Sequence, residues 1–298
     1  MGVGLMKQKS INGLIVPLLT PMNEQLELDS FALKTLVARL MNKGVKSFFI
    51  LSPFAEQQKL SLREEKEIIK LVSSLVGKRA NLLIGCFASS IEEIIDKVLF
   101  AQKVSSDCVV NVPFDAITNE IVFVDFFDRL LRRTKANIYL LNDPYYFKRN
   151  IPIVGLERIV NWEKLIGVID YSANFGYFKA LTDHYQSINV FQGKEELMVD
   201  SMETHCAGFA PTFSNLMPSL FFNIEKEFVE VGYEKMLRKQ TKINFILRDY
   251  FPAAKRLQSI KYALSFEGVI QKFFSVDLKK LEDDEEEKIE SFFENSFA

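Results

Sequence analysis

Histidine and cysteine are the side chains best suited to metal binding and to nucleophilic chemistry near neutral pH, and this chain contains few of them. Its two histidines, His184 and His205, have no partner at a spacing typical of metal ligands, although Cys206 adjoins His205. The other cysteines, Cys86 and Cys108, are distant in sequence, and an odd total of three indicates neither a disulfide framework nor a CxxC site. We therefore predict no metal site, a structural role for the histidines, and a reducing compartment.

Short apolar segments alternate with longer amphipathic segments along most of the chain. Good helix starts follow two of these segments: Asp29 is a typical N-cap, and Ser61 with Glu64 forms a capping-box pattern. Further helices are expected at residues 90–104, 119–133 and 152–162. The expected strands lie at residues 13–19, 46–51, 81–87, 108–112, 137–141, 165–170, 189–191 and 207–211.

Eight strand–helix units within roughly 230 residues match the size of a (β/α)8 TIM barrel. Several strands are continuous apolar runs, which is typical of a parallel sheet buried on both faces. A doubly wound open sheet is the alternative, but no GxGxxG turn follows any strand. Beyond residue 228 the pattern is helical, at 233–250, at 252–264 and from Asp277 onward. We predict an α/β barrel at residues 1–228, with C-terminal helices at 229–298 packed on it in the same structural unit.

Charge and length limit the classes of partner. The 298 residues carry 37 basic and 39 acidic side chains, a formal net charge of −2, which argues against a nucleic-acid or anionic-membrane binder. No apolar run reaches the roughly 18 residues that cross a bilayer. We expect a cytoplasmic protein whose acidic C-terminal segment is a solvated helix face; an interaction tail is the alternative.

Several motifs occur in the order found in the dihydrodipicolinate synthase and N-acetylneuraminate lyase family. The run Gly13-Leu-Ile-Val-Pro-Leu-Leu-Thr-Pro21 followed by Leu28-Asp29 resembles the opening of that family. The segment from Leu60 to Lys66 is similar to its Leu-Ser-x-Glu-Glu-Arg segment. Further matching segments are Gly85 to Glu93, Leu141-Asn142 before Pro144, and Ala207-Gly208 with Asn215 and Pro218.

This resemblance implies a tetrameric barrel that acts on pyruvate or another 2-keto acid. In the family, a lysine of the sixth strand forms a Schiff base with the keto carbon, and a tyrosine at the end of the fifth strand transfers protons. An imine provides the electron sink for carbon–carbon cleavage, and the amine must be desolvated so that it can attack. No cofactor is predicted.

The residues that carry this chemistry differ here. Ile169 stands at the lysine position and Leu141 at the tyrosine position. The family's Gly-Thr-Thr-Gly-Glu, which holds the substrate carboxylate, corresponds to residues 52–56, of which only Glu56 is shared, and Phe114 follows Pro113 where the family has tyrosine. Neither isoleucine nor leucine can form an imine or move a proton.

Other residues could replace the lost groups. Tyr139 and Tyr171 lie two residues from Leu141 and Ile169, so strand alternation points them to the same side. Lys194 follows the seventh strand and is the best candidate for a displaced amine; Lys148 and Lys179 have less claim. The structural alternatives are favoured: barrel packing for the tyrosines and an exposed surface position for Lys194.

We therefore expect a divergent family member without Schiff-base activity, a small-molecule-binding or scaffolding homo-oligomer, dimer or tetramer. Its ligand by resemblance is a 2-keto acid or a sugar acid. One alternative is an active lyase or aldolase that uses Lys194; another is a different enzyme using Glu56, Asn142 and Tyr171 as acids and bases. The predicted pocket-lining residues are Ser52, Pro53, Phe54, Glu56, Phe114, Asn142 and Gly193.

Overall fold

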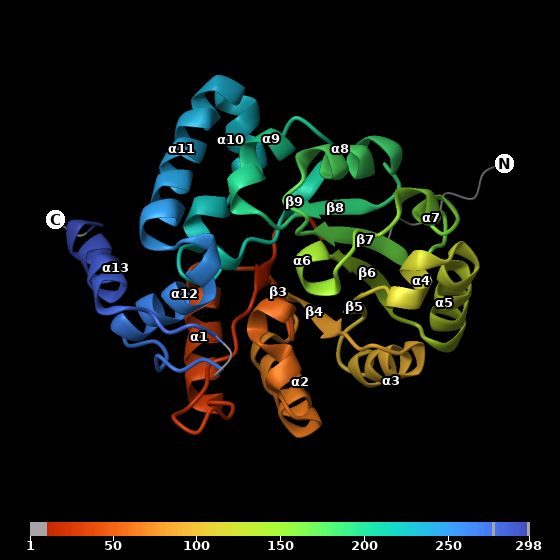
Figure 1. Ribbon diagram of the computed structural model, residues 1–298, viewed down its shortest axis with the longest axis horizontal. Helices are drawn as coiled ribbons and strands as arrows, with labels where there is room; N and C mark the ends of the chain where they lie inside the picture. Colours follow the sequence, from red (N-terminus) through yellow and green to blue (C-terminus); the bar gives the residue numbers. More distant parts are fainter. Residues whose placement is uncertain (1–10, 276–277, 297–298) are drawn as a thin grey trace.

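The computed structural model describes residues 11–275 and 278–296 and shows a barrel of parallel strands wrapped by helices (Figure 1). Within these residues the sheet contains nine strands: β1 (Gly13–Leu14), β2 (Val16–Pro17), β3 (Ser47–Ile50), β4 (Asn81–Cys86), β5 (Asp107–Val110), β6 (Asn137–Asn142), β7 (Leu165–Asp170), β8 (Asn189–Gln192) and β9 (Cys206–Phe209).

The first two strands are two parts of one barrel strand. β1 pairs with β9, β2 pairs with β3, and only Ile15 separates them. The N–H of Ile15 donates to the carbonyl of Phe209 at 2.8 Å, which continues the pairing with β9. The sheet therefore closes on itself, so the (β/α)8 prediction is confirmed and the open doubly wound sheet is wrong.

Four longer helices of the barrel begin where the sequence predicts: α1 (Ser30–Asn42), α2 (Leu62–Val76), α3 (Ile91–Ala101) and α5 (Glu120–Arg133). A fifth, α8 (Phe175–His184), follows β7, where the sequence has a helical pattern without a defined start. The Asp29 side chain accepts from the N–H of Ala32, and Ser61 and Glu64 form the capping box. These contacts satisfy N–H groups that a helix leaves without intrahelical partners.

Shorter helices occupy several loops: α4 (Phe114–Thr118), α6 (Pro144–Phe147), α7 (Ile153–Glu157), α9 (Met198–Ser201) and α10 (Ile224–Val231). The helix predicted at 152–162 is wrong in length, because α7 ends at Glu157. The chain then turns back toward β7 through bonds from the N–H of Trp162 to Ile159 and from the N–H of Leu165 to Trp162.

Three further helices follow the barrel: α11 (Tyr233–Tyr250), α12 (Arg256–Phe266) and α13 (Asp283–Ser296). Figure 1 shows them gathered on one side of the barrel. Asp277, the predicted start of the last helix, lies outside the described residues. Apolar side chains of these helices share one continuous core with the outer face of the barrel strands. In the described part of the chain, no helix is both long enough and apolar enough to cross a bilayer.

A second apolar cluster fills the barrel interior. It contains inward-facing side chains from the strands, including Phe49, Leu83, Val109, Tyr139 and Phe191. Alternate strand residues belong to the outer core, as the two-residue period of a strand requires.

Candidate functional site

The carboxyl ends of β6 and β7 bring the two diverged positions together. Leu141 pairs in register with Ile169, and Asn142 pairs with Asp170. Leu141 and Ile169 are almost fully buried and belong to the interior cluster. The positions that the family resemblance assigns to a tyrosine and a lysine are thus adjacent here and carry apolar side chains inside the barrel.

Tyr139 and Tyr171 also belong to the interior cluster, as strand alternation predicts. Tyr139 packs against Phe191, with ring centroids 6.3 Å apart. Burial raises its pKa above the ordinary value, and the Asp107 carboxylate adds to the shift. The Tyr171 hydroxyl donates to the carbonyl oxygen of Ala210, and burial raises the pKa of Tyr171 as well.

The ring of Tyr171 lies directly on the backbone of Gly193. A Cβ atom at that position would overlap the ring, so glycine is required for this contact. Lys194 follows, half-buried, with its Nζ 6.0 Å from the centroid of the same ring. The candidate amine is therefore at the rim of the barrel, on the ring of Tyr171.

Phe54 covers Tyr171 from the loop after β3. The two ring centroids are 4.4 Å apart. Phe54 lies in the short 3₁₀ turn Pro53–Ala55, between Leu51 and Glu56, whose φ angles are 55° and 56°. The left-handed conformation is uncommon for residues other than glycine.

Polar groups near this loop are already paired within the protein, with one exception. The buried Glu56 carboxylate binds Lys261 Nζ and accepts from the N–H of Ser275 at 2.6 Å. Asn142 Nδ2 donates to Asp170 Oδ1 at 2.6 Å, and its Oδ1 accepts from the N–H of Ile151 at 2.8 Å. The exception among the described residues is Ser52 Oγ, which is buried without a hydrogen-bond partner.

Asp170 and Lys261 are buried titratable residues that belong to none of the sequence motifs. Asp170 is fully buried, and this desolvation raises its pKa to about 6, although Asn142 and Ser172 donate to it. Burial also lowers the pKa of Lys261 despite the adjacent Glu56. The available signals were an aspartate that ends an apolar strand and a lysine within the apolar run Ile260–Leu264 of a helix.

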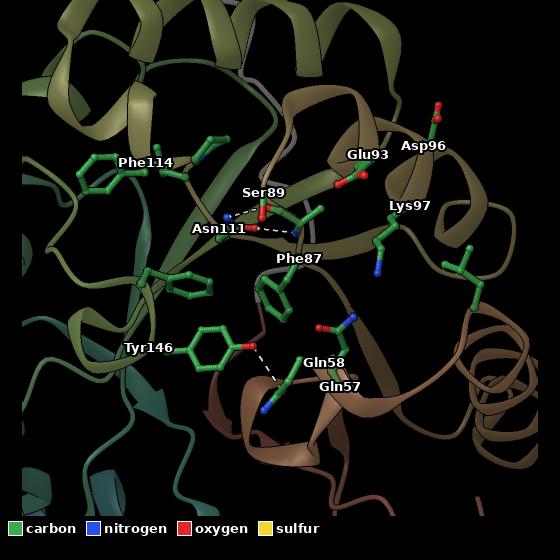
Figure 2. Close-up of a pocket in the computed structure, with 15 residues that line it drawn as sticks. Gln57, Gln58, Phe87, Ser89, Glu93, Asp96, Lys97, Asn111, Phe114 and Tyr146 are labelled. Carbon is green, nitrogen blue, oxygen red and sulfur yellow. Dashed lines mark hydrogen bonds between the residues drawn. The ribbon is translucent and has the colours of Figure 1, made fainter. Parts of the chain in front are cut away.

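A cavity of about 720 Å³, called the lateral cavity below, is lined in part by Phe87 of the interior cluster and by Phe147, which packs against that cluster (Figure 2). It lies between the N-terminal part of α3, the loops after β3 and β5, and α6. The side chains lining it include aromatic rings, amides and three charged groups of α3: Phe87, Phe114, Tyr146, Phe147, Gln57, Gln58, Asn111, Glu93, Asp96 and Lys97. Its volume is typical of a small-molecule site.

Hydrogen bonds hold the polar lining in place. Tyr146 donates its hydroxyl to Gln58 Oε1 at 3.2 Å, as Figure 2 shows. Lys97 Nζ donates to both carboxylate oxygens of Glu65, at 2.8 and 2.9 Å. Of the predicted pocket residues, Phe114 lines this cavity, while the side chains of Ser52, Pro53, Phe54, Glu56, Asn142 and Gly193 are not part of its lining. Of the predicted pocket residues, the structure therefore places Phe114 in the lateral cavity and the others outside its lining.

Comparisons with known proteins agree with this architecture. The sequence model of the Dihydrodipicolinate synthetase family matches residues 10–295. The 4-hydroxy-tetrahydrodipicolinate synthase of Hydrogenobaculum sp. is 24% identical over 284 residues, which cover 94% of this chain and 96% of the relative. An uncharacterized DapA-like lyase of Pyrococcus horikoshii is 24% identical over 262 residues, covering 87% of this chain and 91% of the relative.

Solved structures share the fold over nearly the whole chain. Dihydrodipicolinate synthase from Bacteroides thetaiotaomicron superposes with a TM-score of 0.86 at 26% identity, covering 95% of this chain and 98% of that one. CdNal from Clostridium difficile, solved in complex with mannosamine, gives a TM-score of 0.89 at 15% identity, covering 96% and 99%. The family match, the curated relatives and the closed barrel lead to one conclusion: this chain belongs to the dihydrodipicolinate synthetase family.

Proposed function

We propose that this protein is a family member without Schiff-base lyase activity that binds a small molecule. The observation that carries the proposal is the buried pair Leu141 and Ile169 at the carboxyl ends of β6 and β7. An imine requires a primary amine that can reach the substrate carbonyl, and proton transfer requires a titratable group beside it. These two aliphatic side chains provide neither.

The groups that could replace them are poorly placed for that chemistry. Tyr171 is fully covered, its hydroxyl donates to a backbone carbonyl, and its raised pKa opposes ionisation. Lys261 is buried and lowered in pKa, but its ammonium group is bound by Glu56. Phe54 packs on the ring of Tyr171. Acid–base roles for Glu56, Asn142 and Tyr171 would require breaking the hydrogen bonds that hold these side chains.

We propose that the lateral cavity holds the ligand and that the ligand is a sugar acid. A cavity of about 720 Å³ is large for a three-carbon keto acid. Its amides and the Tyr146 hydroxyl can bind hydroxyl groups, and the aromatic rings can pack on a sugar face. Lys97 Nζ donates to Glu65, and its third N–H is left for a ligand carboxylate. By family resemblance, we also propose that the protein is cytoplasmic and forms a homo-oligomer, either a dimer or a tetramer.

Borohydride trapping tests the loss of imine chemistry. The protein is incubated with pyruvate and sodium borohydride, and the intact mass is measured. We expect no covalent adduct and no retro-aldol turnover across a panel of sugar acids. A stable pyruvate adduct would contradict the proposal.

An active lyase with a displaced amine is the second candidate, and one observation favours it. Lys194 Nζ lies beside the ring of Tyr171, and the Asp143 carboxyl is close enough to interact with it. If this candidate is correct, an adduct forms in the native protein and disappears in Lys194→Ala. Absence of an adduct in both proteins rejects it.

Ligand binding is tested by calorimetric titration with gluconate and other sugar acids, with pyruvate as the small control. We expect saturable binding that Ser89→Phe abolishes by filling the cavity, since Ser89 lines it. Ser187→Phe, at an exposed position before β8, is the matched control and should bind normally. Equal binding by both variants would show that the ligand lies elsewhere.

A further inference from the structure

One C-terminal helix contacts two loops of the barrel mouth through buried ion pairs. Lys261 of α12 binds Glu56 in the loop after β3, and both side chains are almost inaccessible, with exposed fractions of 0% and 3%. Arg256, at the start of α12, donates to Glu195 Oε2 at 3.0 Å and to Glu196 Oε1 at 2.6 Å in the loop after β8. The helix therefore holds loops that enter the mouth from different strands.

Both loops converge on Tyr171. From the first loop, Phe54 packs on the Tyr171 ring at a centroid distance of 4.4 Å. From the second, the backbone of Gly193 supports the same ring, two residues before Glu195. The contacts form a closed circuit that runs from α12 to one loop, through the stacked rings, and back through the other loop to α12.

The first loop holds an unfavourable backbone conformation. Leu51 and Glu56, on either side of the turn that carries Phe54, have φ angles of 55° and 56°. Such conformations persist in residues other than glycine only where the surroundings impose them. At Glu56 the surroundings are Lys261 and the N–H of Ser275, which together bind both carboxylate oxygens.

We propose that residues 51–56 form a lid over the carboxyl end of the barrel and that α12 is the clasp that keeps this lid closed. The Lys261–Glu56 pair fixes the end of the lid, and this contact keeps Phe54 on Tyr171. Lys261 is a positioning residue in this arrangement, because it acts on the mouth through Glu56. When Lys261 loses its ammonium group, the Glu56 carboxylate is left buried and unpaired, and contact with water stabilises it. The strained loop then relaxes outward.

This inference rests on the proposed closed mouth, and its test measures accessibility rather than turnover. The two proposals can therefore fail separately. A pyruvate adduct would overturn the loss of imine chemistry whatever the reporter shows, and an inactive barrel could have a lid that α12 does not control.

Ser52 provides a reporter inside the lid. Its side chain is fully buried and its Oγ has no partner, so Ser52→Cys loses no hydrogen bond. The reaction of this thiol with Ellman's reagent then measures lid opening. The labelling rate of the three native cysteines is measured in the protein that keeps Ser52, and it is subtracted from the rate of the Ser52→Cys protein. Two of them, Cys86 and Cys108, are buried in the outer core.

The critical variant is Lys261→Met in the Ser52→Cys background. Lys255→Met is its matched control, because Lys255 pairs with Glu285 at 2.6 Å, next to α12 but away from the lid. We expect Lys261→Met to accelerate labelling of the reporter at least about tenfold, and Lys255→Met to change it less than about twofold, at unchanged far-ultraviolet circular dichroism.

Glu56→Gln is the second variant, in case Lys261→Met does not fold. It removes the charge and keeps an oxygen for the N–H of Ser275, and it should also accelerate labelling. If a folded Lys261→Met or Glu56→Gln protein labels at the rate of the Ser52→Cys parent, the clasp is refuted. Reporter labelling that is as fast in the native protein as in urea would refute the closed lid itself.

Discussion

Asp170 provides a quantitative test of the buried polar network at the end of β7. The perturbation is Asp170→Asn, which keeps an oxygen for Asn142 Nδ2 and the N–H of Ser172. The new amide faces the Ser172 hydroxyl, which can rotate to accept instead of donating. The packing of the site is therefore retained while its titratable group is removed.

The magnitude follows from the shift in pKa. Burial raises the pKa of Asp170 from 3.8 to about 6. Because the native state then binds more protons than the unfolded state, the free energy of unfolding falls as pH rises from about 4 to about 6.5. At about 1.4 kcal/mol per pKa unit, ionising this carboxyl group costs the native protein about 3 kcal/mol. Asp170→Asn does not pay this cost.

Urea denaturation followed by circular dichroism at about pH 4.5 and about pH 7.5 measures the effect. We expect the wild type to lose about 2 kcal/mol more stability than Asp170→Asn between these values, because part of the difference of about 3 kcal/mol already develops below pH 4.5. Carboxyl groups with lowered pKa, such as Glu64 and Glu196, act in the opposite direction but are common to both proteins. Asp115→Asn, at an exposed position, should follow the wild type.

Parallel pH profiles for the wild type and Asp170→Asn would refute the reasoning. They would mean that the carboxyl group is ionised in the native state at little cost, and hence that the hydrogen bonds from Asn142 and Ser172 offset its burial.

Two further predictions concern the closed mouth. Ile169→Lys places an amine beside Leu141 inside the barrel, and we expect it to lower the free energy of unfolding, measured in urea, by several kcal/mol. Combined with Lys261→Met, which opens the lid, it should also give a borohydride-trapped pyruvate adduct. An adduct of equal yield in the wild type would contradict this. Gly193→Ala should cost about 1 to 3 kcal/mol, because its Cβ displaces the Tyr171 ring; a thermal midpoint equal to that of the wild type would contradict it.

The barrel was predictable because its signals are local. The apolar run 165–170 matches β7. Asp29 and Ser61 each cap a helix through a hydrogen bond to a residue three positions later, so each helix start is marked by a segment of four residues. The division of the first barrel strand at Ile15 was not predictable from the residue pattern. It arises because the first part of this strand pairs with β9 and the second part pairs with β3. Closure of a sheet into a barrel leaves no periodic signal in the sequence.

The site was predictable only in part, for the same reason. Strand alternation placed Leu141, Ile169 and Tyr139 inside the barrel, as the structure shows. Glu56 was expected to line a pocket, but its carboxylate binds Lys261, 205 positions later in the sequence. The lateral cavity depends on how α3 and α6 are oriented around the mouth, and neither helix carries a pattern that specifies this orientation.

The sequence separation between Glu56 and Lys261 has a consequence for synthesis on the ribosome. At roughly 5–20 residues per second, the carboxylate of Glu56 exists for on the order of 10 to 40 s before the lysine that pairs with it is made. During that interval the strands that carry the mouth can associate, but no ammonium group is present to compensate the charge of Glu56. The ion pair at the barrel end therefore cannot form until residue 261 has been made, after all the strands of the barrel have been synthesised.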